Sequence, residues 1–235
     1  MAESGTPELS VVVPALNEAA GIAAALAPLQ EWRERGAEVL VVDGGSDDGT
    51  LEAAAPWADR VLEGPQGRAR QMNAGAAEAT GRVLLFLHAD TRPPEDGDRL
   101  LLAGLARNGR SWGRFDVRLS GAGRHPLLRV VGSLMNARSR LTGIATGDQG
   151  LFVERDAFEA EGGFPEQPLM EDIALSAALK ACCGRPLCLR APIRTSSRRW
   201  EDNGVLRTIL LMWGLRLRYW LGADPAVLAA RYKQG

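Results

Sequence analysis

The chain has 235 residues, of which 46% are apolar and 24% are charged, and its formal net charge is −1 at pH 7. These are the values of a globular protein long enough to bury a substantial core. A charge this close to zero gives no reason to expect a nucleic-acid binder or a polybasic membrane protein.

Strands and helices alternate over the first hundred residues. Short, apolar, β-branched runs predict strands at residues 10–13, 39–42, 60–62 and 83–87, with helices between them at 19–35, 48–57 and 68–79. Continuous apolar strands that alternate with helices are typical of parallel sheets buried on both faces. We therefore predict an α/β fold with a mostly parallel central sheet covered by helices on both faces.

The second half of the chain is mixed rather than regularly wound. Strands are predicted at residues 112–119 and 150–153, and helices at 125–141, 170–182, 203–221 and from near Pro225. No internal repeat or linker separates the two halves. We predict one domain over residues 1–235, with functional halves at about 9–100 and 101–235.

The predicted helix at 203–221 is apolar on one side, with Arg207, Arg216 and Arg218 interleaved. Such a helix can pack on the sheet as ordinary core, pair two subunits, or rest on a membrane surface. These three possibilities remain open.

The cysteines indicate in which cellular compartment the protein works. Cys182, Cys183 and Cys188 are odd in number and have no histidine nearby, which does not suit a zinc site or a disulfide framework. No signal peptide is indicated, and no uncharged stretch approaches the roughly 20 residues of a spanning helix. We expect a cytoplasmic protein that at most contacts the inner face of a membrane.

Polar side chains follow the predicted strands. Asn17 and Glu18 come after the first strand, Asp43 after the second, and His88 and Asp90 after the fourth. Ligands of open parallel sheets bind beyond the carboxyl ends of the strands. We therefore expect a ligand site at this edge of the sheet.

Residues 41–50, VVDGGSDDGT, place an acid and two glycines at a strand end. Asp43 can accept a hydrogen bond from a ring N–H of a nucleobase, and the glycines allow the backbone to approach a ligand. The alternative is an ordinary turn with Ser46 or Asp47 as a helix cap. Neither a dinucleotide-binding glycine motif nor a P-loop is present.

The helix at 68–79 begins with Arg68 and Arg70, although a helix N-terminus favours negative charge. An anionic ligand beside Arg68 would remove this penalty. An exposed arginine pair in solvent is the alternative.

His88 and Asp90 are two residues apart, so they share one face if the strand continues. A carboxylate at a strand end suits Mg²⁺ or Mn²⁺, which commonly take substrate phosphates as further ligands. Alternatively, His88 is a partly buried residue with a satisfied ring, and Asp90 caps the turn before Pro93.

Acids also open the helix near residue 170. Glu171 and Asp172 suit the helix dipole there, and a carboxylate so placed can also act as a general base toward a hydroxyl. Further on, SSRRWEDNG at 196–204 can clamp a diphosphate or hold an interface or core tryptophan.

In their order along the chain, these segments resemble family 2 glycosyltransferases of the GT-A fold. The resemblance covers nearly all of residues 9–200 and rests on VVVPALNE, VVDGGSDDGT, GRARQMNAG, GRVLLFLHADT, GGFPEQPLMED and RRW. More narrowly, LHADT and GDQGLFV look like a small, soluble bacterial subgroup of the family.

The resemblance implies transfer of a sugar from a UDP- or GDP-sugar to an acceptor hydroxyl, with inversion and with Mn²⁺ or Mg²⁺ as cofactor. It implies that Asp90 binds the metal, with His88 as a ligand or behind it, and that Asp172, beside Glu171, is the catalytic base. The acceptor side would contain Gly147, Asp148 and Gln149. The donor-binding residues that it implies are Pro14, Asn17, Glu18, Asp43, Gly44, Ser46, Arg68, Gln71, Asn73, Ala89, Arg199 and Trp200.

Two positions depart from the family's motifs: His88 replaces the first aspartate of D-x-D, and Ser196 replaces the glutamine of Q-x-x-R-W. Two other functions also stay open. One is a nucleotidyltransferase, which would carry a glycine-rich basic loop where PALNE follows the first strand. The other is a nucleotide-sugar-binding protein that has lost catalysis.

Overall fold

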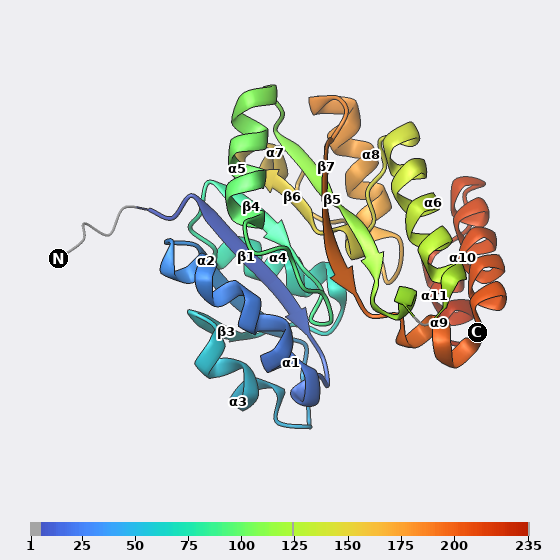
Figure 1. Ribbon diagram of the computed structural model, residues 1–235, viewed down its shortest axis with the longest axis horizontal. Helices are drawn as coiled ribbons and strands as arrows, with labels where there is room; N and C mark the ends of the chain where they lie inside the picture. Colours follow the sequence, from blue (N-terminus) through green and yellow to red (C-terminus); the bar gives the residue numbers. More distant parts are fainter. Residues whose placement is uncertain (1–5, 124, 235) are drawn as a thin grey trace.

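The computed structural model describes residues 6–123 and 125–234 and is built on one seven-stranded sheet (Figure 1). The strands lie in the order β3-β2-β1-β4-β6-β5-β7. Their bounds are β1 Leu9–Ala15, β2 Glu38–Asp43, β3 Arg60–Glu63, β4 Val83–Phe86, β5 Trp112–Leu119, β6 Leu151–Glu154 and β7 Leu187–Thr195. β6 pairs antiparallel with both of its neighbours, and the other pairings are parallel.

The central strands are buried on both faces, as their continuous apolar runs predict. Every residue of β1 is buried. Because side chains alternate along a strand, Val11 and Val13 join one core cluster, while Val12 joins a second one on the other face. Trp32 packs in the first cluster and Met72 in the second.

Helices cover both faces of the sheet, which confirms the predicted fold class. One face is covered by α1 (Ala19–Leu26), α2 (Gln30–Glu34), α3 (Thr50–Ala54) and α5 (Gly97–Asn108). The other face is covered by α4 (Arg68–Glu78), α7 (Arg155–Ala160) and α8 (Glu171–Cys183).

A further group of helices gathers beyond β5 and β7 (Figure 1). It comprises α6 (Pro126–Thr142), α9 (Arg198–Asn203), α10 (Val205–Trp220) and α11 (Pro225–Gln234). Leu128 and Val131 of α6 pack with Ile209 of α10 in one small core, and Leu215 packs with Leu228 of α11 in another. Across the residues described, no helix is long and apolar enough to cross a membrane.

Prolines shift two predicted helices. The segment 19–35 is not one helix, because a 3₁₀ turn at Ala27–Leu29, with Pro28 in its first turn, separates α1 from α2. Likewise, α3 gives way to a 3₁₀ turn at Ala55–Trp57 that contains Pro56. The six predicted strands are present, while α5, α7, α9 and β7 were not predicted.

Candidate functional site

The loops that follow β1 and β2 are tied to each other at the carboxyl edge of the sheet. Asp43 is 1% exposed, and its carboxylate accepts hydrogen bonds from the backbone N–H groups of Gly45 (2.9 Å) and Ser46 (2.7 Å) and from the Ser46 hydroxyl. The Ser46 hydroxyl in turn accepts a hydrogen bond from the Asn17 N–H at 2.8 Å. Asn17, with φ of 54°, accepts one from the Asp47 N–H. The turn is thus held by Asp43 and Asn17 rather than by a helix cap at Ser46 or Asp47, since the residue that caps α3 is Gly49.

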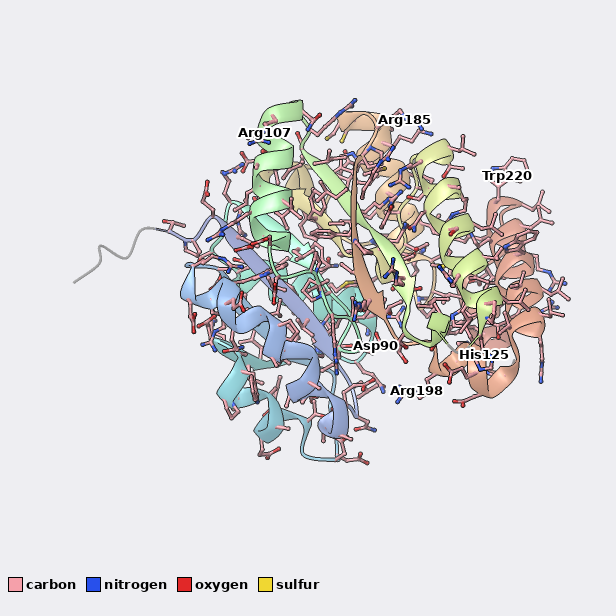
Figure 2. The ribbon with its side chains drawn as sticks, viewed as in Figure 1. Asp90, Arg107, His125, Arg185, Arg198 and Trp220 are labelled. Atoms are coloured by element: carbon pink, nitrogen blue, oxygen red, sulfur yellow. The ribbon has the colours of Figure 1, made fainter. Side chains whose placement is uncertain are left out.

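Glu18 and Asp90 bring negative charge to the same edge. Burial raises the pKa of Glu18, the guanidinium of Arg198 lowers it, and the charge of Asp90 raises it. Arg198, on α9, lies 3.9 Å from the Glu18 carboxylate. Figure 2 shows Asp90 beyond the ends of the central strands, with Arg198 below it in the same view.

The strand does not continue through His88 and Asp90. β4 ends at Phe86, so the two residues stand in a turn, where Asp90 is exposed and accepts a hydrogen bond from the Thr91 hydroxyl at 3.3 Å. The expectation that both lie on one face of a strand is therefore not met.

The ring of His88 lies against the loop at 147–148. Its Nδ1 is 3.5 Å from Oδ1 of Asp148, and a Cβ added to Gly147 would overlap the ring at Nε2. Nε2 is buried and has no hydrogen-bond partner among the described residues. Burial raises the pKa of Asp148, but His88 and Arg68 outweigh this and hold that pKa below its usual range. The His88 ring therefore faces Asp148 through Nδ1.

The two acids that open α8 differ in their surroundings. Met170, with φ of 66°, turns the chain into the helix, and Glu171 is 3% exposed with its carboxylate 3.5 Å from Nη1 of Arg68. Asp172 accepts hydrogen bonds from the N–H of Gly147 at 2.6 Å and of Ile173 at 2.7 Å.

The pKa of Asp172 is shifted well above its usual range. Burial and the adjacent charge of Glu171 raise the pKa of Asp172 to about 6, against the lowering effect of the two N–H groups and Arg68. A carboxylate of this basicity is suited to accept a proton near neutral pH.

Asp172 opens onto a cavity of about 730 Å³. The polar part of its wall contains Arg68, His88, Gly147, Asp148, Glu171 and Asp172, all of which were singled out from the sequence. Trp200 also lines it, while α6 and α10 supply much of the remainder. The cavity therefore joins the predicted base to the predicted acceptor side.

The side chains of other predicted site residues form hydrogen bonds to the backbone of neighbouring segments or pack against such side chains. Nε2 of Gln71 donates to the carbonyl oxygens of Ala15 (2.7 Å) and Val42 (2.8 Å), and Gly44 lies directly against the Gln71 side chain. The amide of Asn73 pairs with both the N–H and the carbonyl of Phe164.

Four more predicted residues contact other parts of the fold or are buried in it. The Arg199 guanidinium stacks 3.6 Å from the centroid of the Tyr232 ring, and Gln149 is fully buried against Thr146 and Asn136. Pro14 and Ala89 are buried as well.

Some residues of the site were missed. Arg198 was considered only as part of SSRRWEDNG and was not among the donor-binding residues that the resemblance implied, and Arg138 and Arg216, which line the cavity, were not singled out for the site. For Arg138 and Arg216 the available signal was the presence of arginines in helices without acidic residues, and for Arg198 it was the neighbouring Arg199-Trp200 pair.

The profile of the family described as "Glycosyl transferase family 2" matches residues 10–160 of the chain. The chain belongs to glycosyl transferase family 2. This confirms the resemblance seen in the motifs, while the narrower LHADT subgroup stays a prediction.

Curated glycosyltransferases match part of the chain. Glycosyltransferase AglE of Haloferax volcanii is 34% identical over 99 residues, which is 38% of this chain and 33% of AglE. A PGL/p-HBAD biosynthesis glycosyltransferase of Mycobacterium tuberculosis is 38% identical over 91 residues, 36% of each protein. The matches thus span about a third of these relatives.

Solved structures show the fold of the chain. Mannosyltransferase PcManGT of Pyrobaculum calidifontis, in complex with GDP-Man and Mn²⁺, has a TM-score of 0.68 at 22% identity and covers 97% of this chain and 69% of its own. TarS residues 1–349 of S. aureus, in complex with UDP-GlcNAc, has a TM-score of 0.67 at 20% identity, with coverage of 80% and 58%. The chain has the GT-A fold of these transferases.

Proposed function

We propose that the chain is a single GT-A unit that transfers a sugar from a nucleoside diphosphate donor to an acceptor hydroxyl. The observation that carries this proposal is Asp172, a carboxylate whose pKa is raised to about 6 in the wall of a 730 Å³ cavity at the ligand edge of the sheet. Family membership and the donor complexes of PcManGT and TarS support it.

The donor nucleoside binds at the loops after β1 and β2 in this proposal. Asn17, Glu18, Asp43 and Ser46 stand there. Oδ2 of Asp43 already accepts two N–H groups, but Oδ1 accepts only the Ser46 hydroxyl and retains acceptor capacity for the N3–H of uracil or the N1–H of guanine. The donor is a UDP- or GDP-sugar. Gln71 and Asn73 hold the surrounding backbone in place.

Asp90 fits a divalent ion that is held mainly by the donor. No group of three or more His, Cys, Asp or Glu side chains forms a metal cage in the described part of the chain, and the Asp90 carboxylate is exposed at the donor edge. Mg²⁺ and Mn²⁺ are often bound by one carboxylate together with substrate phosphates and water. Bound there, the ion would neutralise charge on the departing diphosphate. His88 does not fit as a ligand, because it faces Asp148 and Gly147.

Asp172 supplies the base. It removes the proton of the acceptor hydroxyl as that oxygen forms a bond to the anomeric carbon, and the bond from this carbon to the diphosphate oxygen breaks on the opposite side. This single in-line displacement inverts the anomeric centre. Glu171, paired with Arg68, keeps the pKa of Asp172 high.

Calorimetry tests the donor site. We expect UDP or GDP to bind the full chain in the presence of Mn²⁺, and Asp43→Asn to weaken that binding at least tenfold. Asp47→Asn, an exposed acid of the same loop, is the matched control and should bind as wild type does. Absence of binding by every nucleoside diphosphate tried would refute the proposal, and binding without any donor turnover would favour a binding protein instead.

We further propose that the enzyme works in the cytoplasm and contacts a membrane through α10. Its outer face carries Leu206, Leu210, Trp213, Leu217 and Trp220, and Leu221 follows the helix; these side chains are 57–81% exposed. Trp220 stands at the outer edge of this helix (Figure 2). The exposed Arg207 and Arg218 flank this stripe and suit anionic headgroups. Flotation with anionic vesicles that is lost in Trp220→Asp supports this contact, whereas a concentration-dependent dimer with no flotation contradicts it.

A further inference from the structure

The cavity beside Asp172 is walled mainly by apolar side chains. A sugar acceptor would leave its hydroxyl groups without partners against such walls, which is unfavourable. An apolar body is instead stabilised by burial there. The apolar wall includes Leu134 and Leu141 from α6, Ile173 at the start of α8, and Met212, Trp213 and Leu217 from α10.

Two arginines interrupt this apolar wall without a counter-charge. Nε and Nη2 of Arg138, on α6, are buried and have no hydrogen-bond partner in the part of the chain that the structure describes. Arg216, on α10, forms no hydrogen bond or ion pair with another described residue, and burial lowers its pKa. Neither α6 nor α10 contains an acidic residue.

The acidic side chains of the cavity contact other groups than Arg138 and Arg216. Glu171 faces Arg68, Asp148 faces His88, and Asp172 is held by two backbone N–H groups. Guanidinium nitrogens that are buried without a hydrogen-bond partner are unfavourable, so the cavity as built favours a ligand that brings an acidic group.

The cavity also meets the exposed surface of α6 and α10. Leu134 and Leu141 of α6, and Trp213 and Leu217 of α10, line the cavity and are each at least 52% exposed. A long apolar chain can therefore extend from the cavity along these helices.

We infer that the acceptor is an amphipathic alcohol whose hydroxyl reaches Asp172, whose apolar body lies between α6 and α10, and whose acidic group pairs with Arg138. Arg216 adds positive charge to the same cavity. The inference rests on the proposed function, in which Asp172 takes the proton of the acceptor. The acidic group is a carboxylate or a phosphate, which share the chemistry that a guanidinium recognises.

Binding by calorimetry tests this inference without donor or turnover. The probes are 12-hydroxydodecanoate and 12-hydroxydodecyl phosphate, each compared with 1,12-dodecanediol, which lacks the acid, and with 4-hydroxybutanoate, which lacks the apolar chain. We expect one or both acidic long-chain probes to bind at least tenfold more tightly than either comparison compound. Whichever of the two binds more tightly identifies the acidic group.

Matched variants locate the binding. Arg138→Met should abolish the preference for the acidic probe over the diol, while Arg129→Met, an exposed arginine of the same helix, should keep it. Leu134→Asp should weaken binding at least tenfold, while Leu127→Asp, equally 52% exposed on α6 but outside the cavity wall, should not.

Equal binding of the acid and the diol, or equal effects of Leu134→Asp and Leu127→Asp, would overturn the inference. Donor turnover in a chain that binds no probe would overturn it and leave the proposed function standing. Probe binding at the cavity with no turnover of any donor would overturn the proposed function instead, so the two failures are distinguishable.

Discussion

Asp172→Asn removes the proposed base with little change to the fold. The carboxylate accepts hydrogen bonds from the N–H groups of Gly147 and Ile173, and an asparagine oxygen can keep one of them. Loss of the other costs about 1 kcal/mol, and relief of the repulsion between Asp172 and Glu171 offsets part of that loss. We expect the free energy of unfolding to change by no more than about 1 kcal/mol.

The effect on turnover should be far larger. General-base catalysis contributes roughly 10²–10⁴-fold, so kcat of Asp172→Asn should fall by about that factor. The base acts in its ionised form, and its pKa is about 6. The wild-type rate should therefore be nearly constant above about pH 7 and fall about tenfold between pH 7 and pH 5, because only about one carboxyl in ten is ionised at pH 5.

The assay is hydrolysis of the donor, followed by release of UDP or GDP, between pH 5 and 8. Asp156→Asn, an exposed acid in the first turn of α7, is the matched control and should keep the wild-type rate and pH profile. A folded Asp172→Asn variant with at least a third of the wild-type kcat, or a wild-type rate that does not change between pH 5 and 7, would refute the assignment of the base.

Three further changes probe other parts of the site. Asp90→Asn should lower the affinity for activating Mn²⁺ at least tenfold, measured by titration of the ion in the hydrolysis assay; unchanged activation would argue against a metal at Asp90. Gly147→Ala would force the His88 ring to move and would disturb the hydrogen bond that the Gly147 N–H donates to Asp172. We therefore expect kcat to fall while the donor Kd stays constant, and a change in Kd alone would place the loop in the donor site. Asn73→Ala removes two hydrogen bonds to Phe164 and should lower the free energy of unfolding in urea by about 2 kcal/mol with no change in donor Kd; the reverse pattern would give Asn73 a donor contact.

The central strands could be predicted because they are buried on both faces, which leaves a continuous apolar run in the sequence. β7 lacks that signal: it is an edge strand, with arginines at 190 and 194 and a proline at 192 where the register to β5 shifts. α5 could have been found from Asp98 in its first turn and from Gly109, which ends it with φ of 56°.

The strand-end residues of the site were predictable because parallel strands bring their carboxyl ends to one edge. What each side chain touches there was not. Asn73 meets a backbone 91 positions further along the chain, and His88 turns toward Asp148 because β4 ends before it. Local spacing carries no information about such contacts. The cavity likewise is lined by segments far apart in the sequence, with α6, the start of α8 and α10 among them.

Turnover of a donor panel by the purified full chain tests the central claim most directly. UDP- and GDP-sugars are each incubated with Mn²⁺, with Mg²⁺ or with EDTA, and the released nucleoside diphosphate is measured. We predict that at least one donor is hydrolysed only with the divalent ion, and that Asp172→Asn removes this hydrolysis. No release from any donor, together with pyrophosphate release from a nucleoside triphosphate and a sugar phosphate, would contradict the claim.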